Sequence, residues 1–153
     1  MQTSYKREMD EGIPGEIYDL SDNRIDSYAC EGGSVYPGMG VVGGTDVETQ
    51  VKLPSATTST IKGIALVQAK GVDANGDIVY NDGDTVPVLD TGRCWVEVTT
   101  AVAADEAAYL VFTGDDAGKF TNATNAGETA SAITGAKFKK TTTAAGISVL
   151  ELK

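Results

Sequence analysis

The sequence predicts a mainly β fold: a single small antiparallel β-barrel or sandwich with an extended N-terminal arm. From residue 30 onward, short apolar runs alternate with turn residues about every 8 to 12 positions, as in small all-β domains. The chain contains 18 glycines and few long stretches of helix-forming residues. At 153 residues it can bury one core without metal or disulfide support, so we expect one body.

Residues 1–29 differ from the rest of the chain. They carry three basic and seven acidic residues, and their apolar residues occur singly without a sustained period of two or 3.6. Such a segment cannot bury enough surface to fold alone, but it can lie across a partner. We therefore predict an extended arm over residues 1–29, mobile in the free protein, and a β-barrel-like body over residues 30–153.

The first half of the body is expected to contain two strands and two tight turns. Residues 34–42 read as a strand that bends at Pro37-Gly38, and residues 52–60 as a polar loop. Residues 61–69 form a clear strand pattern, in which Gly63 suggests a bulge or a close backbone approach. The segments "VDANGD" and "NDGD" then read as successive turns around the short apolar run "IVY".

The second half is expected to continue the same alternation. "TVPVL" and "RCWVEVTT" read as strands on either side of a turn at Asp90-Thr91-Gly92. A helical turn is expected over residues 101–107, followed by a strand that ends near Phe112. A polar loop is expected over residues 121–134, and "GAKFKKTT" and "GISVLEL" close the series as strands.

Alternation over residues 93–99 assigns side chains to the two faces of one strand. Cys94, Val96 and Val98 share one face, which has the character of a core. Trp95 therefore lies on the outer or subunit-facing side. It makes either a second, minor core contact or an anchor for another subunit.

Composition disfavours several functional classes. The net charge is −10, with 12 basic and 22 acidic residues, so nucleic acid and anionic membrane surfaces are disfavoured as partners. The chain has no histidine, which removes the commonest general base and metal ligand. Cys30 and Cys94 form no CxxC pair, and we expect both to be small, buried, reduced residues in a protein assembled in the cytoplasm. No cofactor is expected.

Asp90-Thr91-Gly92 matches the catalytic tripeptide of aspartic proteases. Such an enzyme needs two facing carboxylates that share a proton, which dimerisation of this chain could supply. However, Arg93 and the bulky Cys94-Trp95 follow at once, where the proteases have small and polar residues. Ordinary turn chemistry is the favoured interpretation, and a retroviral-type aspartic protease remains an alternative.

Residues 73–84, "DANGDIVYNDGD", partly match a calcium-binding loop. Asp73, Asn75 and Asp77 occupy positions 1, 3 and 5, but Ile78 replaces the glycine at position 6 and Asp84 the glutamate at position 12. Two successive hairpin turns explain the same residues, and calcium binding stays open as the weaker alternative.

Two longer stretches resemble tailed-phage head cement (decoration) proteins. One is "GEIYDLSDNRIDSYACEGGSVYPGMGVVGG", residues 15–44, and the other is "IKGIALVQAKGVDANGDIVYNDGDTVPVLDTGRCWVEV", residues 61–98. Both are turn and strand patterns without a chemical signature. The resemblance covers residues 12 to about 113 well and the C-terminal 40 residues loosely.

The resemblance implies a non-enzymatic protein of the virion, located on the outer surface of the capsid. Its partners would be the major capsid protein and copies of itself, commonly in a homotrimer, with the arm spread over neighbouring subunits. A bacterial surface or pilus-like β-domain is the other alternative. The residues expected at the capsid or subunit interface are Ile13, Pro14, Ile17, Tyr18, Leu20, Arg24, Tyr28 and Trp95.

Overall fold

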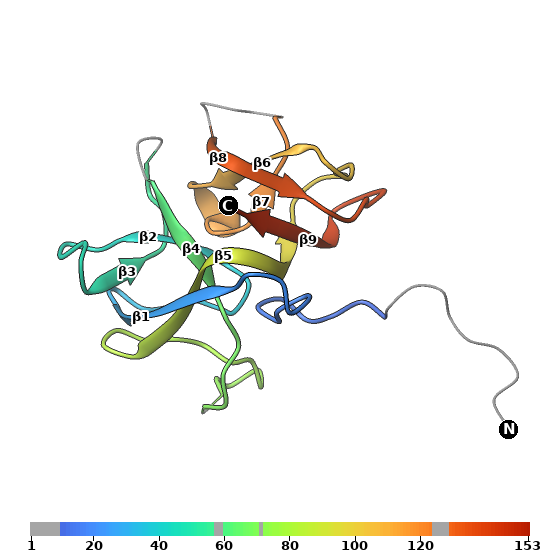
Figure 1. Cartoon of the computed structure of the whole chain (residues 1–153). Coiled ribbons are helices and arrows are strands. Elements are labelled where there is room, and N and C mark those ends of the chain that lie inside the picture. Colours follow the sequence, from blue (N-terminus) through green and yellow to red (C-terminus); the bar gives the residue numbers. More distant parts are fainter. Residues whose placement is uncertain (1–9, 57–59, 71, 124–128) are drawn as a thin grey trace, which may run out of the picture.

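The computed structural model describes residues 10–56, 60–70, 72–123 and 129–153, and these form nine β-strands (Figure 1). Over this part of the chain there is no α-helix, and so no helix that could span a membrane. The strands are β1 (Arg24–Cys30), β2 (Gly40–Gly43), β3 (Gln50–Lys52), β4 (Ile61–Ala65), β5 (Thr85–Val98), β6 (Ala107–Val111), β7 (Phe120–Thr121), β8 (Ala130–Phe138) and β9 (Gly146–Leu152).

The strands close into two rings that share β5. In the first ring, hydrogen-bonded neighbours run β1–β3–β2–β4–β5 and return to β1, which makes a closed five-stranded barrel. In the second, β5 pairs with β7 and β9, and β6 and β8 complete the circuit. Figure 1 shows the two groups on either side of β5. The predicted mainly β, barrel-containing fold is confirmed, and the second ring is a feature that the sequence did not reveal.

The buried side chains form two clusters. Side chains of β5 enter both: Val86 and Val88 belong to the first, and buried residues from Leu89 onward belong to the second, which also takes in Val42 and Ile64 of the first ring. The first cluster contains Cys30, Val35, Val41, Val51, Ala65, Tyr80, Val86 and Val88. The second is larger and contains, among others, Leu89, Cys94, Val96, Val98, Leu110, Phe120, Phe138 and Leu150. The predicted core face of Cys94, Val96 and Val98 is confirmed.

The predicted turn at Asp90-Thr91-Gly92 is wrong. These residues lie inside the continuous strand β5, where Thr91 pairs with Arg24 of β1 and Gly92 with Leu152 of β9. Gly92 has a φ of +130°, and a β-carbon at this position would lie 2.1 Å from the side-chain oxygen of Asn23. The glycine therefore allows the Asn23 side chain to lie close to the backbone of β5, at the point where this strand passes from one ring to the other. The chain does not reverse direction there.

Gly63 has the role expected of it. The register of β2 and β4 shifts opposite this residue, and an added β-carbon would lie 2.2 Å from the backbone oxygen of Leu89. The predicted bend at Pro37-Gly38 is also present. By contrast, the helical turn expected over residues 101–107 is absent. Glu106 instead closes a tight turn, in which its carboxylate accepts a 2.8 Å hydrogen bond from the backbone N–H of Ala103.

The N-terminal segment departs from the predicted arm. Residues 24–29 belong to β1 and pair with β5 along most of the strand, so the barrel begins before residue 30. The strand was not predicted because residues 24–27 are exposed and show no alternation of apolar and polar side chains. Backbone pairing, more than side-chain burial, holds the first half of β1. Residues 10–23 also contact the body, and residues 1–9 of the predicted arm lie outside the described residues.

Cys30 and Cys94 are both free and buried, as predicted. Burial raises the pKa of both thiols, that of Cys94 to about 12. Thiolate, the reactive form, is therefore scarce at neutral pH. We expect intact-mass analysis after alkylation without reductant to show two labels on the denatured chain and almost none on the native protein. A denatured chain that takes up two labels only after reduction would contradict this expectation.

Candidate functional site

Residues 12–18, here called the strap, lie along the second half of β5. The backbone N–H of Gly15 donates to the carbonyl of Trp95 (2.8 Å), and the Trp95 N–H donates to the carbonyl of Glu16 (2.9 Å). The Tyr18 N–H donates to the carbonyl of Arg93 (2.9 Å), and Ile17 stands opposite Cys94 in an antiparallel bridge. The strap is therefore a short added strand, which β5 holds through backbone groups.

Trp95 lies beneath the strap. Its side chain points away from the Cys94 face, as alternation predicts, yet the residue is only 3% exposed. The Tyr18 ring meets the indole edge-to-face at 5.5 Å, and the Lys140 ammonium lies 4.8 Å from the indole centroid. A β-carbon on Gly12 would lie 2.4 Å from the indole nitrogen, so the chain passes directly over the ring. In this structure Trp95 makes the second core contact, with its own chain as cover.

Three apolar side chains of this region face solvent. Leu20 is fully exposed, Ile13 is 56% exposed and Ile25 is 45% exposed. Arg24 is also exposed, and its guanidinium binds the Asp90 carboxylate at 2.5 Å. Residues 19–23, between strap and β1, form a turn, which the Asn23 side-chain amide closes by donating to the carbonyl of Asp19 (3.0 Å).

The remaining predicted interface residues are partly buried against the body. Pro14 packs beside Gly38, and Ile17 packs against the larger buried cluster. Tyr28 packs against the smaller cluster and lies 5.3 Å from the Lys62 ammonium. The structure thus divides the eight residues. Ile13, Leu20 and Arg24 are exposed. Pro14, Ile17, Tyr18 and Tyr28 pack against the body, and Trp95 is the buried residue of the body on which the strap lies.

Sequence reasoning missed Ile25 as an exposed residue of this surface. A signal existed, since "RIDS" places one apolar residue among three polar ones at the start of a strand. Val47 and Val72 are comparably exposed (58% and 59%) but lie on other loops of the first ring. The loop that carries Val47, between β2 and β3, lies at the far left of Figure 1, well away from residues 10–23.

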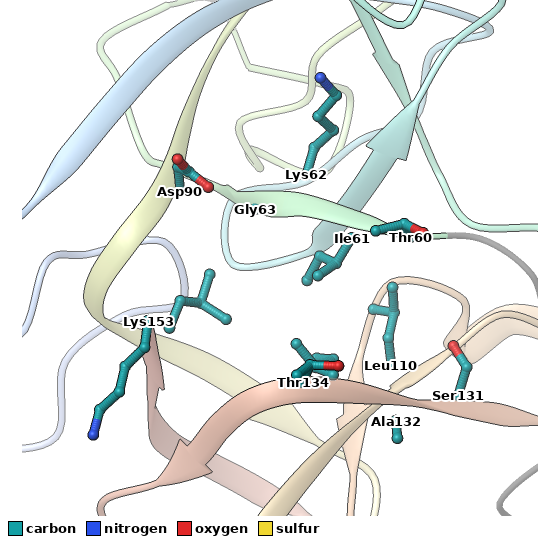
Figure 2. A pocket seen from close by; sticks show the side chains of 12 residues that line it. Thr60, Ile61, Lys62, Gly63, Asp90, Leu110, Ser131, Ala132, Thr134 and Lys153 are labelled. Atoms are coloured by element: carbon teal, nitrogen blue, oxygen red, sulfur yellow. The ribbon is translucent and has the colours of Figure 1, made fainter.

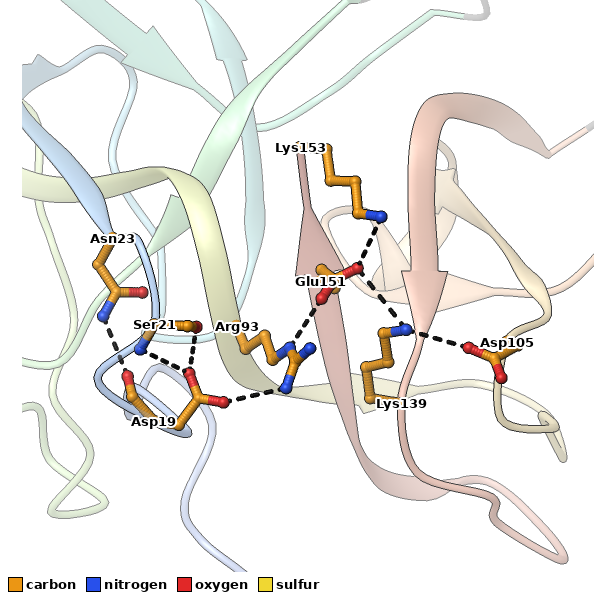
Figure 3. Close-up of polar contacts among 8 residues, drawn as sticks. All are labelled: Asp19, Ser21, Asn23, Arg93, Asp105, Lys139, Glu151 and Lys153. Carbon is orange, nitrogen blue, oxygen red and sulfur yellow. Dashed lines mark hydrogen bonds and ion pairs between the residues drawn. The ribbon is translucent and has the colours of Figure 1, made fainter.

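A chain of ion pairs links Asp19, at the start of the 19–23 turn, to the second ring (Figure 3). Arg93 of β5 binds Asp19 at 3.1 Å and Glu151 of β9 at 2.7 Å. Lys139 lies 3.6 Å from Glu151 and 3.0 Å from Asp105, and Lys153 lies 3.3 Å from Glu151. Glu151 is therefore a nearly buried carboxylate among three cations. The hydrogen bond from Arg93 leads the effects that hold its pKa below the ordinary value, against the opposing effect of burial.

Replacing Glu151 with glutamine is expected to destabilise the protein at pH 7 by about 1.5–3 kcal/mol, the usual contribution of a charged hydrogen bond. Because the folded-state pKa is depressed, this contribution is present above the unfolded pKa and disappears as pH falls through the folded value. Urea unfolding at pH 7 and pH 3 should show a large difference from the wild type only at pH 7. Glu97→Gln, at a half-exposed carboxylate 3.8 Å from Lys119, is the control with little expected effect. An equal loss at both pH values would contradict the electrostatic account.

A groove of about 380 Å³ separates the two rings (Figure 2). Its lining residues come from β4, β5, β6, β8 and β9, and they include the lysines Lys62 and Lys153. Among the described residues that line it, Asp90 is the one with a carboxylate, and this carboxylate is bound by Arg24. The aspartic tripeptide therefore lies in a continuous strand with its carboxylate in an ion pair.

The partial calcium-loop pattern forms two separate turns, as the favoured interpretation predicted. Asp73 accepts hydrogen bonds from the backbone N–H groups of Asn75 (2.8 Å) and Asp77 (3.0 Å). Asp84 accepts one from the N–H of Asn81 (2.7 Å) and binds Lys70. In the part of the chain that the structure describes, no three acidic or cysteine side chains gather in a position to hold a metal ion.

Comparisons with known proteins agree with this architecture. The family model described as "Structural cement protein (E217 gp24/Pam3 gp6)" matches residues 1–153, the whole chain. A chain of the solved structure "The capsid of Myoviridae Phage XM1" superposes with a TM-score of 0.77 at 21% identity, over 100% of this chain and 97% of that one. At that identity the likeness establishes the fold alone. A comparison with curated proteins gave no match.

Proposed function

The chain belongs to the phage structural cement protein family, and from this premise we propose that it binds the outer surface of a phage head and stabilises contacts between major capsid protein subunits. The observation that carries the proposal is the family match over all 153 residues. The structural neighbour from a phage capsid supports it. Members of such a family are structural proteins and not enzymes in general, in keeping with a tripeptide whose carboxylate is bound to arginine.

The charge of the chain favours the exterior of the shell. With 22 acidic and 12 basic residues, each copy carries a net charge of −10. Packaged DNA presents a dense array of phosphates, so a binding site on the inner surface would place like charges side by side. On the outer surface the same field is separated from the genome by the capsid shell.

The proposed attachment surface consists of Ile13, Leu20, Arg24 and Ile25. Large apolar side chains that face water are typical of contact sites for other proteins when they share one surface, and these three lie within one short stretch of the sequence. Arg24 adds a positive group to an otherwise acidic segment, which lets it bind a carboxylate of the capsid when it leaves Asp90. The surface is displayed on the strap, the 19–23 turn and β1, all anchored on β5.

Stabilisation by such a protein follows from linkage. A protein that binds the assembled shell and not its separated subunits stabilises the shell by about RT ln(1 + [L]/Kd) per site. Many sites on one particle multiply this contribution. Closed point symmetry makes it natural for copies to cluster about a symmetry axis, and we place a homotrimer at threefold positions.

The proposed attachment surface can be tested with Ile13→Ser/Leu20→Ser on heads that lack the protein. Both side chains are exposed, so the variant should keep its wild-type melting temperature while its occupancy on pelleted heads falls at least tenfold. Val47→Ser/Val72→Ser is the control, because these valines are also more than half exposed and lie on other loops. Removal of residues 1–23 tests the whole segment that precedes β1. Removal of residues 1–29 would also delete most of β1 and so disturb the barrel. Equal occupancy of the two serine variants would contradict the assigned surface.

A further inference from the structure

We propose that neighbouring copies exchange their straps in the assembled state, so that residues 12–18 of one copy lie on β5 of the next. This exchange rests on the proposed function, in which copies of the protein cluster on a capsid shell. The exchanged partner is a second copy of this chain, because the seat on β5 fits this strap. The contacts that hold the strap in its own copy would be reproduced between copies.

The seat is specific for the strap by shape. Gly12 passes over the Trp95 indole where a β-carbon would lie 2.4 Å from a ring atom. Gly15 has a φ of +88°, and its β-carbon would lie 2.5 Å from Pro37. Gly15 also bonds two elements at once, since its N–H donates to Trp95 and its carbonyl accepts from Val67 (3.0 Å). A segment without glycine at both positions cannot occupy this seat, whereas the strap of any other copy can.

The turn at residues 19–23 has the properties of an exchange hinge. Leu20, Ser21 and Asp22 are exposed, so straightening the turn uncovers little. The side-chain oxygen of Asn23 is buried and accepts no hydrogen bond among the described residues. The closed turn gives this acceptor no partner among the described protein groups, so opening the turn sacrifices no hydrogen bond to it. A short hinge of this kind is compatible with exchange.

The hinge also limits the distance between copies. From Tyr18 to Arg24 the chain has six residue steps, which span about 20 Å when extended. A strap can therefore reach only an immediately adjacent copy. In dilute solution no such copy is present and the strap closes on its own β5, as the structure shows. On a crowded shell the neighbour's seat becomes accessible, and a covalent test can distinguish the two states.

Cys94 provides a built-in reporter. Ile17 and Cys94 form a non-hydrogen-bonded antiparallel pair, in which side chains approach most closely. The Cys94 thiol is buried, so it reacts only when the strap lifts transiently. Ile17→Cys, made together with Cys30→Ser, should therefore form a disulfide with Cys94 slowly, on prolonged copper-phenanthroline oxidation at pH 9. In the free protein the bond should be intramolecular. On pelleted heads at saturation, a non-reducing gel should show more than half of the bound protein as covalent dimers or trimers. Ile17→Cys with Cys94→Ser is the control that forms no such ladder.

Loss of binding to heads by the wild type would refute the proposed function itself. Normal binding with only monomeric, intramolecular disulfides would overturn strap exchange and leave the function standing. A second measurement uses the unmodified chain, in which Glu11 lies 3.8 Å from Lys140. Heads loaded with equal amounts of ¹⁴N and ¹⁵N protein are treated with carbodiimide, and cross-linked peptides are analysed by mass. Mixed-isotope pairs of these two residues support exchange, and their absence overturns it.

Discussion

Replacing Trp95 with alanine is expected to lower the free energy of unfolding by about 3–5 kcal/mol, the usual cost of truncating a buried large aromatic side chain. The indole packs against Tyr18, Lys140 and the backbone at Gly12, and the residue is 3% exposed. Without the indole, Tyr18 and the backbone at Gly12 lose the side chain against which the strap packs. Urea unfolding should show the loss of stability, and limited proteolysis should cut the variant before residue 19 while β1 and the rings survive.

Trp95→Phe is the matched control, since phenylalanine retains an aromatic face for Tyr18 and Lys140. We expect it to lose less than half as much stability and to keep the strap protected. Wild-type stability and wild-type protection of the strap in Trp95→Ala would contradict the role assigned to this residue.

Gly63→Ala is expected to lower the free energy of unfolding by about 3 kcal/mol, at the upper end of what an added methyl group does in a packed interior. The new β-carbon would lie 2.2 Å from the Leu89 carbonyl oxygen and 2.7 Å from a Val88 side-chain carbon. Because the first obstacle is backbone, a rotamer change cannot relieve it. Strands β4 and β5 must separate, and this is the contact that closes the first ring.

Thermal unfolding measures this effect, with a decrease of roughly 6–12 °C expected for a chain of this size. Gly146→Ala is the control, because an added β-carbon there meets no atom within 4 Å and the residue begins strand β9. Similar melting temperatures for the two variants would show that the close approach at Gly63 is not essential.

The sequence predicted those parts of the fold in which side-chain pattern and backbone structure agree. Residues 93–98 alternate in apolar character, and their two faces were assigned correctly. Gly63 stood out in an apolar strand, and the expected close approach is present. The paired turns at residues 73–84 followed from aspartate and asparagine side chains that bind nearby backbone N–H groups.

Other features depend on partners distant in sequence, which no local pattern can identify. Gly92 was interpreted as a turn residue because glycine after aspartate is common in turns. Its actual role comes from Asn23, some seventy positions earlier in the chain. Strand β1 lacked apolar alternation because β5 and β3 hold it through backbone bonds. Trp95 was correctly assigned to the face of β5 opposite Cys94. The sequence of the strap, however, does not indicate that the strap packs on Trp95 and buries it.

The residues of the proposed surface also depend on contacts with distant parts of the chain, so only some of them were predicted from the sequence. The isolated apolar residues of the N-terminal segment were identified, and the exposed ones among them, Ile13 and Leu20, now form part of the proposed surface. Composition could not separate them from Ile17 and Tyr18, which face the body. Only the bridge between Ile17 and Cys94 decides which side of the strap is outward.

Cryo-electron microscopy of mature heads, with and without this protein, tests the central claim most directly. We expect difference density on the outer surface of the shell, clustered about threefold positions, into which the two strand rings fit with β5 between them. Heads that lack the protein should lose DNA at a lower temperature. Difference density on the inner surface or in the tail, or no difference at all, would contradict the proposal that this protein binds the outside of a phage head.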